Sequence, residues 1–289
     1  MLSWFVDSGL NFLPQLVSLL ALWLAGVALF HRRRGFLVAA SVLVVALGIG
    51  LAAYKSTLTA ASGGSGAPLR VMTANLLFSN TDVAALSQAL WERDPDVLVV
   101  QERSPVWSQL LERLLGTDYV LMAESSSGST AIYRRARLEV CPTPEIDIAL
   151  RPRSAVGCAL VDGQPVLVLG VHAPKPNNPA DEGQRAAAFR NYHAVIRAAG
   201  LPTVVAGDHN ASPLSLSFRS YVDRSGLSLP TEAGPWFTPS WPNWLPAIGL
   251  RIDQILVTDE LSARLVGVGP DIGSNHLPVI ADVAILGRR

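Results

Sequence analysis

Six short polar stretches of the sequence carry side chains that can move protons, hold a cation or contact an anion. They are Asn75, Gln101-Glu102, His172, Gly207-Asp208-His209-Asn210, Asp253 and Ser274-Asn275-His276. Carboxylates and imidazoles transfer protons, and carboxylate and amide oxygens bind hard cations. Each stretch stands where an apolar, β-branched run starts or ends. Because binding sites of α/β proteins gather at strand ends, the series predicts a single active site.

The runs beside these stretches predict an α/β fold. Strands are expected at Leu69–Ala74, Asp96–Val100, Ala131–Tyr133, Ala155–Val161, Pro165–Val171, Thr203–Ala206, Ile252–Val257 and Pro278–Ile285. Helical patterns fall at Asp82–Glu92, Pro105–Leu115, Glu182–Ala199 and Leu214–Asp223. Asp162-Gly163 is a hairpin turn signal. Hairpins mixed with strand–helix alternation favour an α/β sandwich over a purely parallel doubly wound sheet.

The ordered series of motifs resembles the endonuclease/exonuclease/phosphatase superfamily, the metal-dependent phosphoesterases related to DNase I. The matching pieces are Thr73-Ala-Asn75-Leu, Val100-Gln101-Glu102, Gly170-Val-His172, Gly207-Asp208-His-Asn210, Arg251-Ile-Asp253 and Ser274-Asn275-His276-Leu-Pro278. Each piece is weak alone, but the set keeps the family's order from about Leu69 to Leu286. The resemblance implies a four-layer α/β sandwich, in which two packed mixed sheets are flanked by helices.

The resemblance also implies a metal site and a catalytic group. Glu102 would be the main ligand of a Mg²⁺ ion (Mn²⁺ is the alternative), with Asn75 and Asn275 beside it, and oxygen ligands suit such a cation. Asp208 would orient or deprotonate the attacking water, and Asn210 would contact the phosphate. Asp253 and His276 would form a pair that stabilises the phosphoryl transition state or acts as base. His172 would be a second phosphate contact or the acid for the leaving group.

One residue departs from the family pattern. The family usually has Asp before the last His, whereas this chain has Asn275. An amide oxygen can still bind Mg²⁺ but brings no charge, so a second metal on this side of the site is in doubt. We interpret the less negative pocket as suited to a more anionic substrate, such as a pyrophosphate or a monoester, rather than a diester. An inactive relative is the alternative.

The remaining histidines and the absent motifs narrow the class of enzyme. Strand alternation points His209 away from its neighbours, which favours a structural role, and His193 is an ordinary helix residue. There is no His-Glu-x-x-His sequence, which argues against a zincin. There is no Gly-x-Ser-x-Gly sequence, which argues against a serine hydrolase.

Two apolar runs precede the domain that carries these motifs. Residues 10–30 and 35–54 are each long enough to cross a bilayer as a helix, and His31-Arg32-Arg33-Arg34 lies between them. A signal peptide would carry its positive charge before the apolar run, so we expect residues 1–55 to form a transmembrane hairpin. Because positive loops stay cytoplasmic, the chain after Lys55 is expected outside, as the catalytic domain of a multi-pass plasma-membrane protein.

Composition agrees with this division of the chain. The 289 residues have no net charge, only 16% are charged, and the mean hydropathy is +0.32. The 49% hydrophobic content excludes a disordered protein, and two cysteines exclude a disulfide scaffold. Four basic residues and one acidic residue lie before residue 68, so the catalytic domain, expected at 68–289, is mildly acidic. Residues 56–67 read as a flexible linker that holds it near the bilayer.

The substrate is the least determined part of the prediction. A Trp- and Pro-rich loop at 235–246 precedes Arg251-Ile-Asp253 and could meet lipid, line a pocket or pack on its own core. Lys175, Arg185, Trp241 and Trp244 are the candidate substrate contacts. An acidic domain tethered to a bilayer suits a lipid phosphate, and membrane-anchored members of this kind resemble the teicoplanin-resistance protein of the superfamily. That resemblance implies polyprenyl pyrophosphate as substrate and the lipid bilayer as partner.

Three alternatives stay open. The first is an extracytoplasmic nuclease, whose basic groove would use Arg134-Arg135-Ala-Arg137 and Arg151-Pro-Arg153. The second is a sphingomyelinase-like phosphodiesterase acting on phospholipid. The third is a non-catalytic membrane scaffold. Cys141 and Cys158 flank neighbouring predicted strands and could form a disulfide outside the cell, with the register undetermined. The oligomeric state is undetermined as well.

Overall fold

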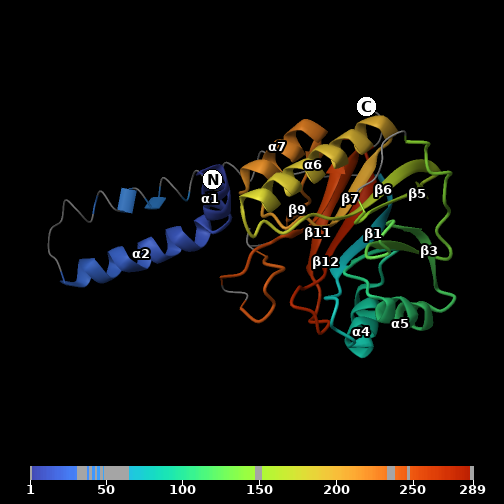
Figure 1. Cartoon of the computed structure of the whole chain (residues 1–289), viewed down its shortest axis with the longest axis horizontal. Helices are drawn as coiled ribbons and strands as arrows, with labels where there is room; N and C mark the ends of the chain where they lie inside the picture. Colours follow the sequence, from blue (N-terminus) through green and yellow to red (C-terminus); the bar gives the residue numbers. More distant parts are fainter. Residues whose placement is uncertain are drawn as a thin grey trace.

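The fold places two β-sheets face to face and covers their outer faces with helices (Figure 1). The computed structural model describes residues 2–30, six positions between 38 and 48 (38, 41, 42, 44, 45 and 48), and residues 65–146, 152–232, 238–245 and 248–286. The expectation of two mixed sheets flanked by helices is confirmed.

The first sheet has seven strands and is mixed. In spatial order they are β3 (Tyr119–Glu124), β4 (Ala131–Arg135), β2 (Val97–Gln101), β1 (Ser65–Asn75), β12 (Val279–Ile285), β11 (Leu261–Val268) and β9 (Thr231–Glu232). β1 runs parallel to β2 and antiparallel to β12. The carboxyl ends of β1 and β2 and the loop before β12 therefore share one edge.

The second sheet has five strands, in the order β5 (Ser154–Val161), β6 (Gln164–His172), β7 (Thr203–Asp208), β10 (Asp253–Thr258) and β8 (Leu227–Ser228). β5 and β6 form the expected hairpin, and its turn residues Asp162 and Gly163 have φ of 49° and 74°. β6 and β7 are parallel, whereas β10 is antiparallel to β7. The ends of β6 and β7 thus meet the start of β10.

Three hydrophobic layers hold these parts together. The inner faces of the two sheets pack through β-branched side chains such as Val71, Val99, Val168 and Val204. α4 (Val83–Arg93) and α5 (Pro105–Leu115) cover the outer face of the first sheet, and α6 (Pro179–Ala199) and α7 (Leu216–Ser225) cover that of the second. Each helix begins with a side-chain cap that accepts backbone N–H groups: Asp82, Ser104, Asn178 and Ser215.

The amino-terminal segment differs from the expected continuous span over residues 10–30. It forms α1 (Leu2–Asn11) and α2 (Leu13–Phe30), which bend by 67° around Phe12. Pro14 lies in the first turn of α2, where a missing backbone N–H is tolerated, so a new helix starts there. Among the described residues no single helix is long and apolar enough to cross a membrane, although the bent pair Trp4–Asn11 and Leu13–Leu24 would suffice together by length and composition.

Other expected features lie outside the described residues or shift slightly. The second apolar run, 35–54, is described only at the six isolated positions, and linker residues 56–64 are not described. Residues 65–67 belong to β1, because Ser65 pairs with Ile285 of β12 across a register shift. The sequence patterns did not predict β3, β8, β9 or β11. β11 is interrupted by a register shift between Leu265 and Gly267, and β3 is a partly exposed edge strand.

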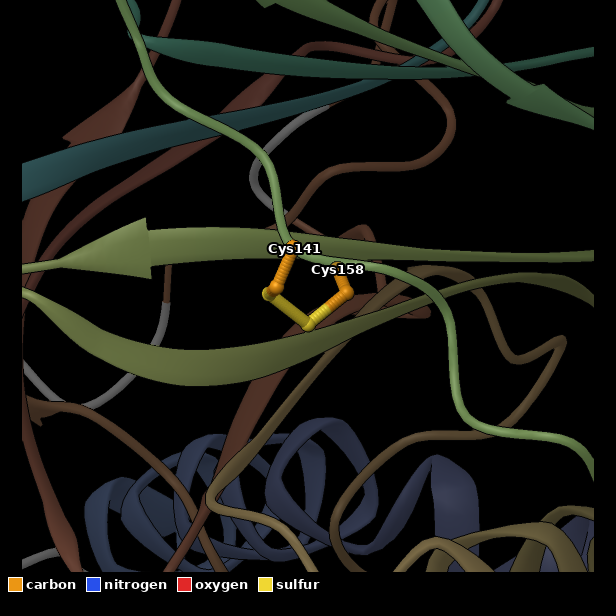
Figure 2. Close-up of a disulfide and its surroundings, with 2 residues drawn as sticks. All are labelled: Cys141 and Cys158. Carbon is orange, nitrogen blue, oxygen red and sulfur yellow. A yellow bond between two sulfur atoms is a disulfide. The ribbon is translucent and has the colours of Figure 1, made fainter.

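Cys141 and Cys158 form a disulfide that joins the segment after β4 to β5 (Figure 2). The backbone N–H of Cys141 donates to the carbonyl of Cys158, and Val140 bridges to Ala159. The strand-like pairing provides the register that the sequence left undetermined. The described part of the chain contains no free cysteine.

Candidate active site

Strand register brings the predicted site residues to one edge of the two sheets. In the first sheet, Asn75 at the end of β1 is level with Gln101 at the end of β2, so Glu102 follows directly. In the second, His172 at the end of β6 is level with Asp208 of β7, and Asp208 faces Asp253 of β10. Polar side chains from five segments far apart in the sequence thus converge.

Asn75 connects the carboxylates of the two sheets. Its Nδ2 donates to Glu102 Oε1 at 3.1 Å and to Asp208 Oδ2 at 3.2 Å, while its Oδ1 accepts the N–H of Leu77. The second oxygen of Glu102 accepts the N–H of Phe78 at 3.0 Å. Glu102 itself has φ of 54°, a left-handed conformation that ends the strand. Asn75 therefore positions Glu102 and Asp208 through its amide nitrogen.

Asp253 and His276 form the expected pair. His276 Nδ1 lies 2.8 Å from Asp253 Oδ2, and both side chains are buried. Ser240 holds the backbone at Asp253 in place, since its Oγ accepts the N–H groups of Ile252 and Asp253. The other ring nitrogen of His276, Nε2, lies 4.0 Å from Asp208 Oδ2. The pair therefore presents Nε2 toward the carboxylate that faces the pocket.

His172 approaches Asp208 from the next strand. Its Nε2 lies 3.7 Å from Asp208 Oδ2. The close approach of β6 and β7 here depends on Gly207, because a Cβ at this position would lie 1.9 Å from the carbonyl oxygen of Val171. Asn210 adds a further amide, with its Nδ2 at 2.9 Å from the carbonyl of Ala173 and at 3.4 Å from Asp208 Oδ2.

Burial and neighbouring charges shift the pKa values of these groups in different directions. Burial, strengthened by nearby Asp253, raises the pKa of Asp208 to about 7. Burial lowers the pKa of His172 to about 4, and Arg153 adds to this shift. Burial also opposes the charged form of His276, but Asp253, Asp208 and Glu102 outweigh it and raise its pKa to about 9.

These shifts assign distinct roles at neutral pH. With these pKa values, neutral pH favours the charged form of His276 and the neutral form of His172, and the pKa of Asp208 lies close to neutral pH, where a general base works best. The Glu102 pKa is lowered, because the bonds from Phe78 and Asn75 outweigh the effect of burial. The arrangement can hold an anion beside His276 and accept a proton from water at Asp208.

The site opens into a pocket of about 450 Å³. Its polar lining residues include Glu102, His172, Asp208, Asn210, Asn275 and His276, together with the cations Arg153 and Lys175. Its apolar lining residues are Trp4, Phe12, Leu77, Trp241, Leu250 and Ile252. Asn75 and Asp253 are 1% exposed and lie behind the pocket wall, which suits positioning rather than contact with substrate.

The donor set fits a divalent cation. Three carboxylates, those of Glu102, Asp208 and Asp253, are buried or half-buried at the site with few cations near them. The buried Oδ1 of Asn275 has no hydrogen-bond partner in the described part of the chain. Asp208, Asp253 and His276 also offer ligand atoms within 4.8 Å of one another, but His276 Nδ1 is already engaged by Asp253. An oxygen set of Glu102 and Asn275 suits Mg²⁺ better. Asn75, predicted as a ligand, instead turns its nitrogen toward Glu102.

The four candidate substrate contacts divide into two pairs. Lys175 and Trp241 line the pocket, with Lys175 Nζ 5.4 Å from the Trp241 ring centroid. Arg185 does not reach the pocket, because it is fully buried and pairs with Asp7 and Glu182. Trp244 is 72% exposed and stands apart from the pocket lining. The expected substrate roles of Arg185 and Trp244 therefore receive no support from their positions.

The sequence patterns did not predict several residues of the site. Trp4, Ser8, Asn11 and Phe12 come from the segment assigned to the membrane anchor, and Ser240 comes from the aromatic loop. The signal that could have revealed the first group is Asp7, a single acid within an apolar helix that needs a buried partner. His209 is buried among aromatic rings and His193 bonds to Ser225, as their structural interpretation expects.

Comparisons with known proteins find a family and a fold that match this chain. The model of the endonuclease/exonuclease/phosphatase family matches residues 72–276. No curated protein matches the sequence. Among solved structures, sphingomyelinase C from Streptomyces griseocarneus is 17% identical, with a TM-score of 0.57 over 75% of this chain and 99% of that one. A mannosyl-6-phosphatase from Bacteroides thetaiotaomicron is 16% identical, with a TM-score of 0.58 over 75% and 100%. The human Nocturnin catalytic domain with bound sulfate is 16% identical, with a TM-score of 0.57 over 77% and 96%. These similarities show a shared fold.

Proposed function

Because the chain belongs to the endonuclease/exonuclease/phosphatase family and is a phosphoester hydrolase, we propose that it is a membrane-anchored, Mg²⁺-dependent enzyme that dephosphorylates a lipid pyrophosphate. The observation that carries this proposal is the place of α2, an apolar helix that starts at the rim of the active-site pocket. Gln15 in its first turn donates to the carbonyl of Gly249, next to the pocket residue Leu250. Leu16, Leu19, Leu22 and Trp23 of α2 are 53–70% exposed, as a lipid-facing helix would be.

The contact between α1 and the domain supports the expected membrane topology. Asp7 precedes both apolar runs and Arg185 follows them, yet their side chains meet at 2.7 Å. This contact supports a topology in which the two ends of the anchor lie on the same side of the membrane, with an even number of crossings between them. A hairpin with Arg32 to Arg34 in its cytoplasmic turn has that topology and places the domain outside. The disulfide supports this placement, because disulfides persist in the oxidising environment outside the cytoplasm.

The arrangement of charges favours a small phosphate group over a nucleic acid. Arg134 and Arg135 belong to the basic groove that a nuclease would use. They lie beside the first residues of β2, whereas Glu102 follows the last residue of that strand. Arg134 donates to three backbone carbonyls, and Arg135 and Arg137 pair with Asp94 and Asp96. Only Arg153 of the described cluster residues lines the pocket. A site with two cations and a positive His276 suits a compact anion.

The proposed reaction is hydrolysis of the phosphoanhydride bond. Asp208 accepts a proton from water as the water oxygen attacks the terminal phosphorus, and the bond to the bridging oxygen breaks. The positive His276, held by Asp253, offsets the charge that develops on the phosphoryl oxygens and supplies a proton to the leaving phosphate. Glu102 and Asn275 would hold Mg²⁺, which polarises the phosphoryl group when bound. Neutral His172 contacts the same oxygens.

Turnover of three substrates tests the proposal. The full-length protein in detergent with Mg²⁺ is offered a polyprenyl pyrophosphate, sphingomyelin or supercoiled plasmid, alongside His276→Ala. His193→Ala, on α6 and bonded to Ser225, is the matched control. We expect phosphate release from the pyrophosphate by the wild type and the control, and loss of at least 100-fold in His276→Ala. Plasmid nicking or phosphocholine release without pyrophosphate turnover would replace the proposal with a phosphodiesterase.

A further inference from the structure

The amino-terminal segment is attached to the catalytic domain at four places, three on α1 and one on α2. Trp4 Nε1 donates to the carbonyl of Pro176, and Asn11 Oδ1 accepts the N–H of Ser212. Asp7 pairs with Arg185, and Gln15, just past the bend, reaches the carbonyl of Gly249. The three contacts of α1 join it to the segment after β6, to α6 and to the segment before α7, so α1 is part of the domain although it precedes the apolar segments.

Asp7 attaches α1 to several polar groups at once. The carboxylate is 4% exposed and accepts bonds from Ser215 Oγ and from the backbone N–H of Ser217, at the amino terminus of α7. Arg185 of α6 binds the carboxylate, with 2.7 Å between its guanidinium and Asp7 Oδ2. A buried carboxylate is stable only with such partners, and a helix amino terminus also favours negative charge. The ion pair thereby fixes the rotation of α1 about its axis.

This rotation directs one face of α1 into the active-site pocket. Trp4, Ser8 and Asn11 are spaced four and three residues apart, so they share a face, and all three line the pocket with Phe12 at the bend. Leu77 and Trp241 line the same pocket, together with the phosphate-binding groups of His172, Asn210 and His276. A substrate with its phosphate beside His276 therefore has Trp4 and Phe12 in the same pocket to contact its organic group.

We infer that α1 is a specificity-determining wall of the active site, in which Trp4 and Phe12 bind the apolar group that carries the phosphate. The inference rests on the proposed function and adds a substrate subsite to it. Phe12 is 42% exposed and lies directly before α2, whose side chains Leu16 and Leu19 are 53% and 62% exposed. Phe12 thus stands between the pocket and the exposed apolar residues of α2, a position suited to contact with the first carbons of a lipid chain.

Binding of two phosphonates that cannot be hydrolysed tests the inference without turnover. Affinities for methylphosphonate and hexylphosphonate are measured by titration calorimetry with Mg²⁺ on the full chain. We expect the wild type to bind hexylphosphonate at least tenfold more tightly. Trp4→Ala combined with Phe12→Ala should reduce this preference at least fivefold, with methylphosphonate affinity kept within twofold. Val6→Ala, on the same helix at 45% exposure and outside the pocket lining, should change neither affinity.

Other outcomes separate this inference from the proposed function. A wild type without preference for the hexyl chain, or a double variant that loses both ligands equally or neither, overturns the role of α1. If thermal unfolding shows that the double variant is not folded, Phe12→Ala alone is used, and a preference unchanged from the wild type overturns the inference. Failure to hydrolyse polyprenyl pyrophosphate overturns the proposed function, while the phosphonate affinities still decide whether α1 binds an apolar chain.

Discussion

His276 Nδ1 and Asp253 Oδ2 lie 2.8 Å apart and join the loop before β12 in one sheet to the first residue of β10 in the other. The aspartate fixes the tautomer and orientation of the ring and favours its charged form. Its own position is set by Ser240. The pair is therefore the place where the packing of the two sheets acts directly on the chemistry of the site.

Replacing this aspartate should disable the histidine without removing it. In Asp253→Asn the ring loses the carboxylate that supports its positive charge, so we expect kcat to fall about 100-fold or more while KM changes little. Steady-state kinetics on the phosphoester substrate measure both. Asp223→Asn, on the exposed face of α7, is the control of equal charge change. A rise in KM at unchanged kcat would contradict a role in the transition state.

Glu102 should control the requirement for metal. Chelation by EDTA is expected to abolish activity, and added Mg²⁺ should restore it. In Glu102→Gln the charge at the cation site is lost, so the Mg²⁺ concentration for half-maximal activity should rise about tenfold or more. Glu92→Gln, on exposed α4, serves as control. If Glu102→Gln lowered kcat at unchanged Mg²⁺ dependence, the carboxylate would not be a ligand.

Asn275 should set the preference between anionic and less anionic substrates. Asn275→Asp places one more negative charge among Glu102, Asp208 and Asp253, which disfavours a pyrophosphate more than a diester. We expect the ratio of diester to pyrophosphate cleavage to rise about tenfold, measured with bis-p-nitrophenyl phosphate and farnesyl pyrophosphate. Asn177→Asp adds the same charge at the exposed rim as a control. Diester cleavage that rises no more than pyrophosphate cleavage refutes this role.

The disulfide should contribute to stability and not to catalysis. It closes a loop with a sequence separation of 17 residues, which corresponds to about 3 kcal/mol from restriction of the unfolded chain. Dithiothreitol, or the double change Cys141→Ser and Cys158→Ser, should lower the unfolding temperature by about 10 °C. Neither should alter kcat. If dithiothreitol left the unfolding temperature of the wild type unchanged, the disulfide would add no stability.

The sequence predicted the site better than it predicted the surroundings of the site. Each strand-end motif is local: a buried run followed by Asn75, Glu102 or Asp208 reveals both the strand and the place where it ends. The parallel pairing of β1 with β2 and of β6 with β7 then brings these ends together. Short edge strands such as β8 and β9, of two residues each, carry no such pattern, because two residues establish no periodicity.

The role of the amino-terminal helix could not be read from its pattern. An apolar helix that docks on a domain and one that enters a membrane have similar compositions, so the sequence does not separate α1, which docks on the domain, from the span expected at residues 10–30. The distinction depends on a contact between Asp7 and Arg185, 178 residues apart in the sequence. The same contact explains why Arg185 is not a substrate residue: its guanidinium is buried against Asp7. Neither the sequence around Asp7 nor that around Arg185 predicts this pairing.

His209 should make the fold sensitive to acid. Its ring is fully buried against Phe218 and Phe189, its Nδ1 donates to the carbonyl of Gly207, and its Nε2 has no partner among the described residues. Burial lowers its pKa to about 4, against an ordinary value of 6.5. Since the unfolded chain binds the proton more readily, the stability is complete above pH 6.5 and declines as the pH falls toward 4.

The expected loss at pH 5 is about 2 kcal/mol, which corresponds to a fall of about 4–8 °C in unfolding temperature. His209→Phe keeps a ring of similar size and cannot be protonated, so the difference in unfolding temperature between pH 7.5 and pH 5 should shrink by that amount. The change is measured against His193→Phe, at a half-buried position on α6. His172 is also buried and is retained in both variants, so its contribution cancels in the comparison. An equal acid response in the wild type and in His209→Phe would show that His209 is not the group that takes up the proton on unfolding.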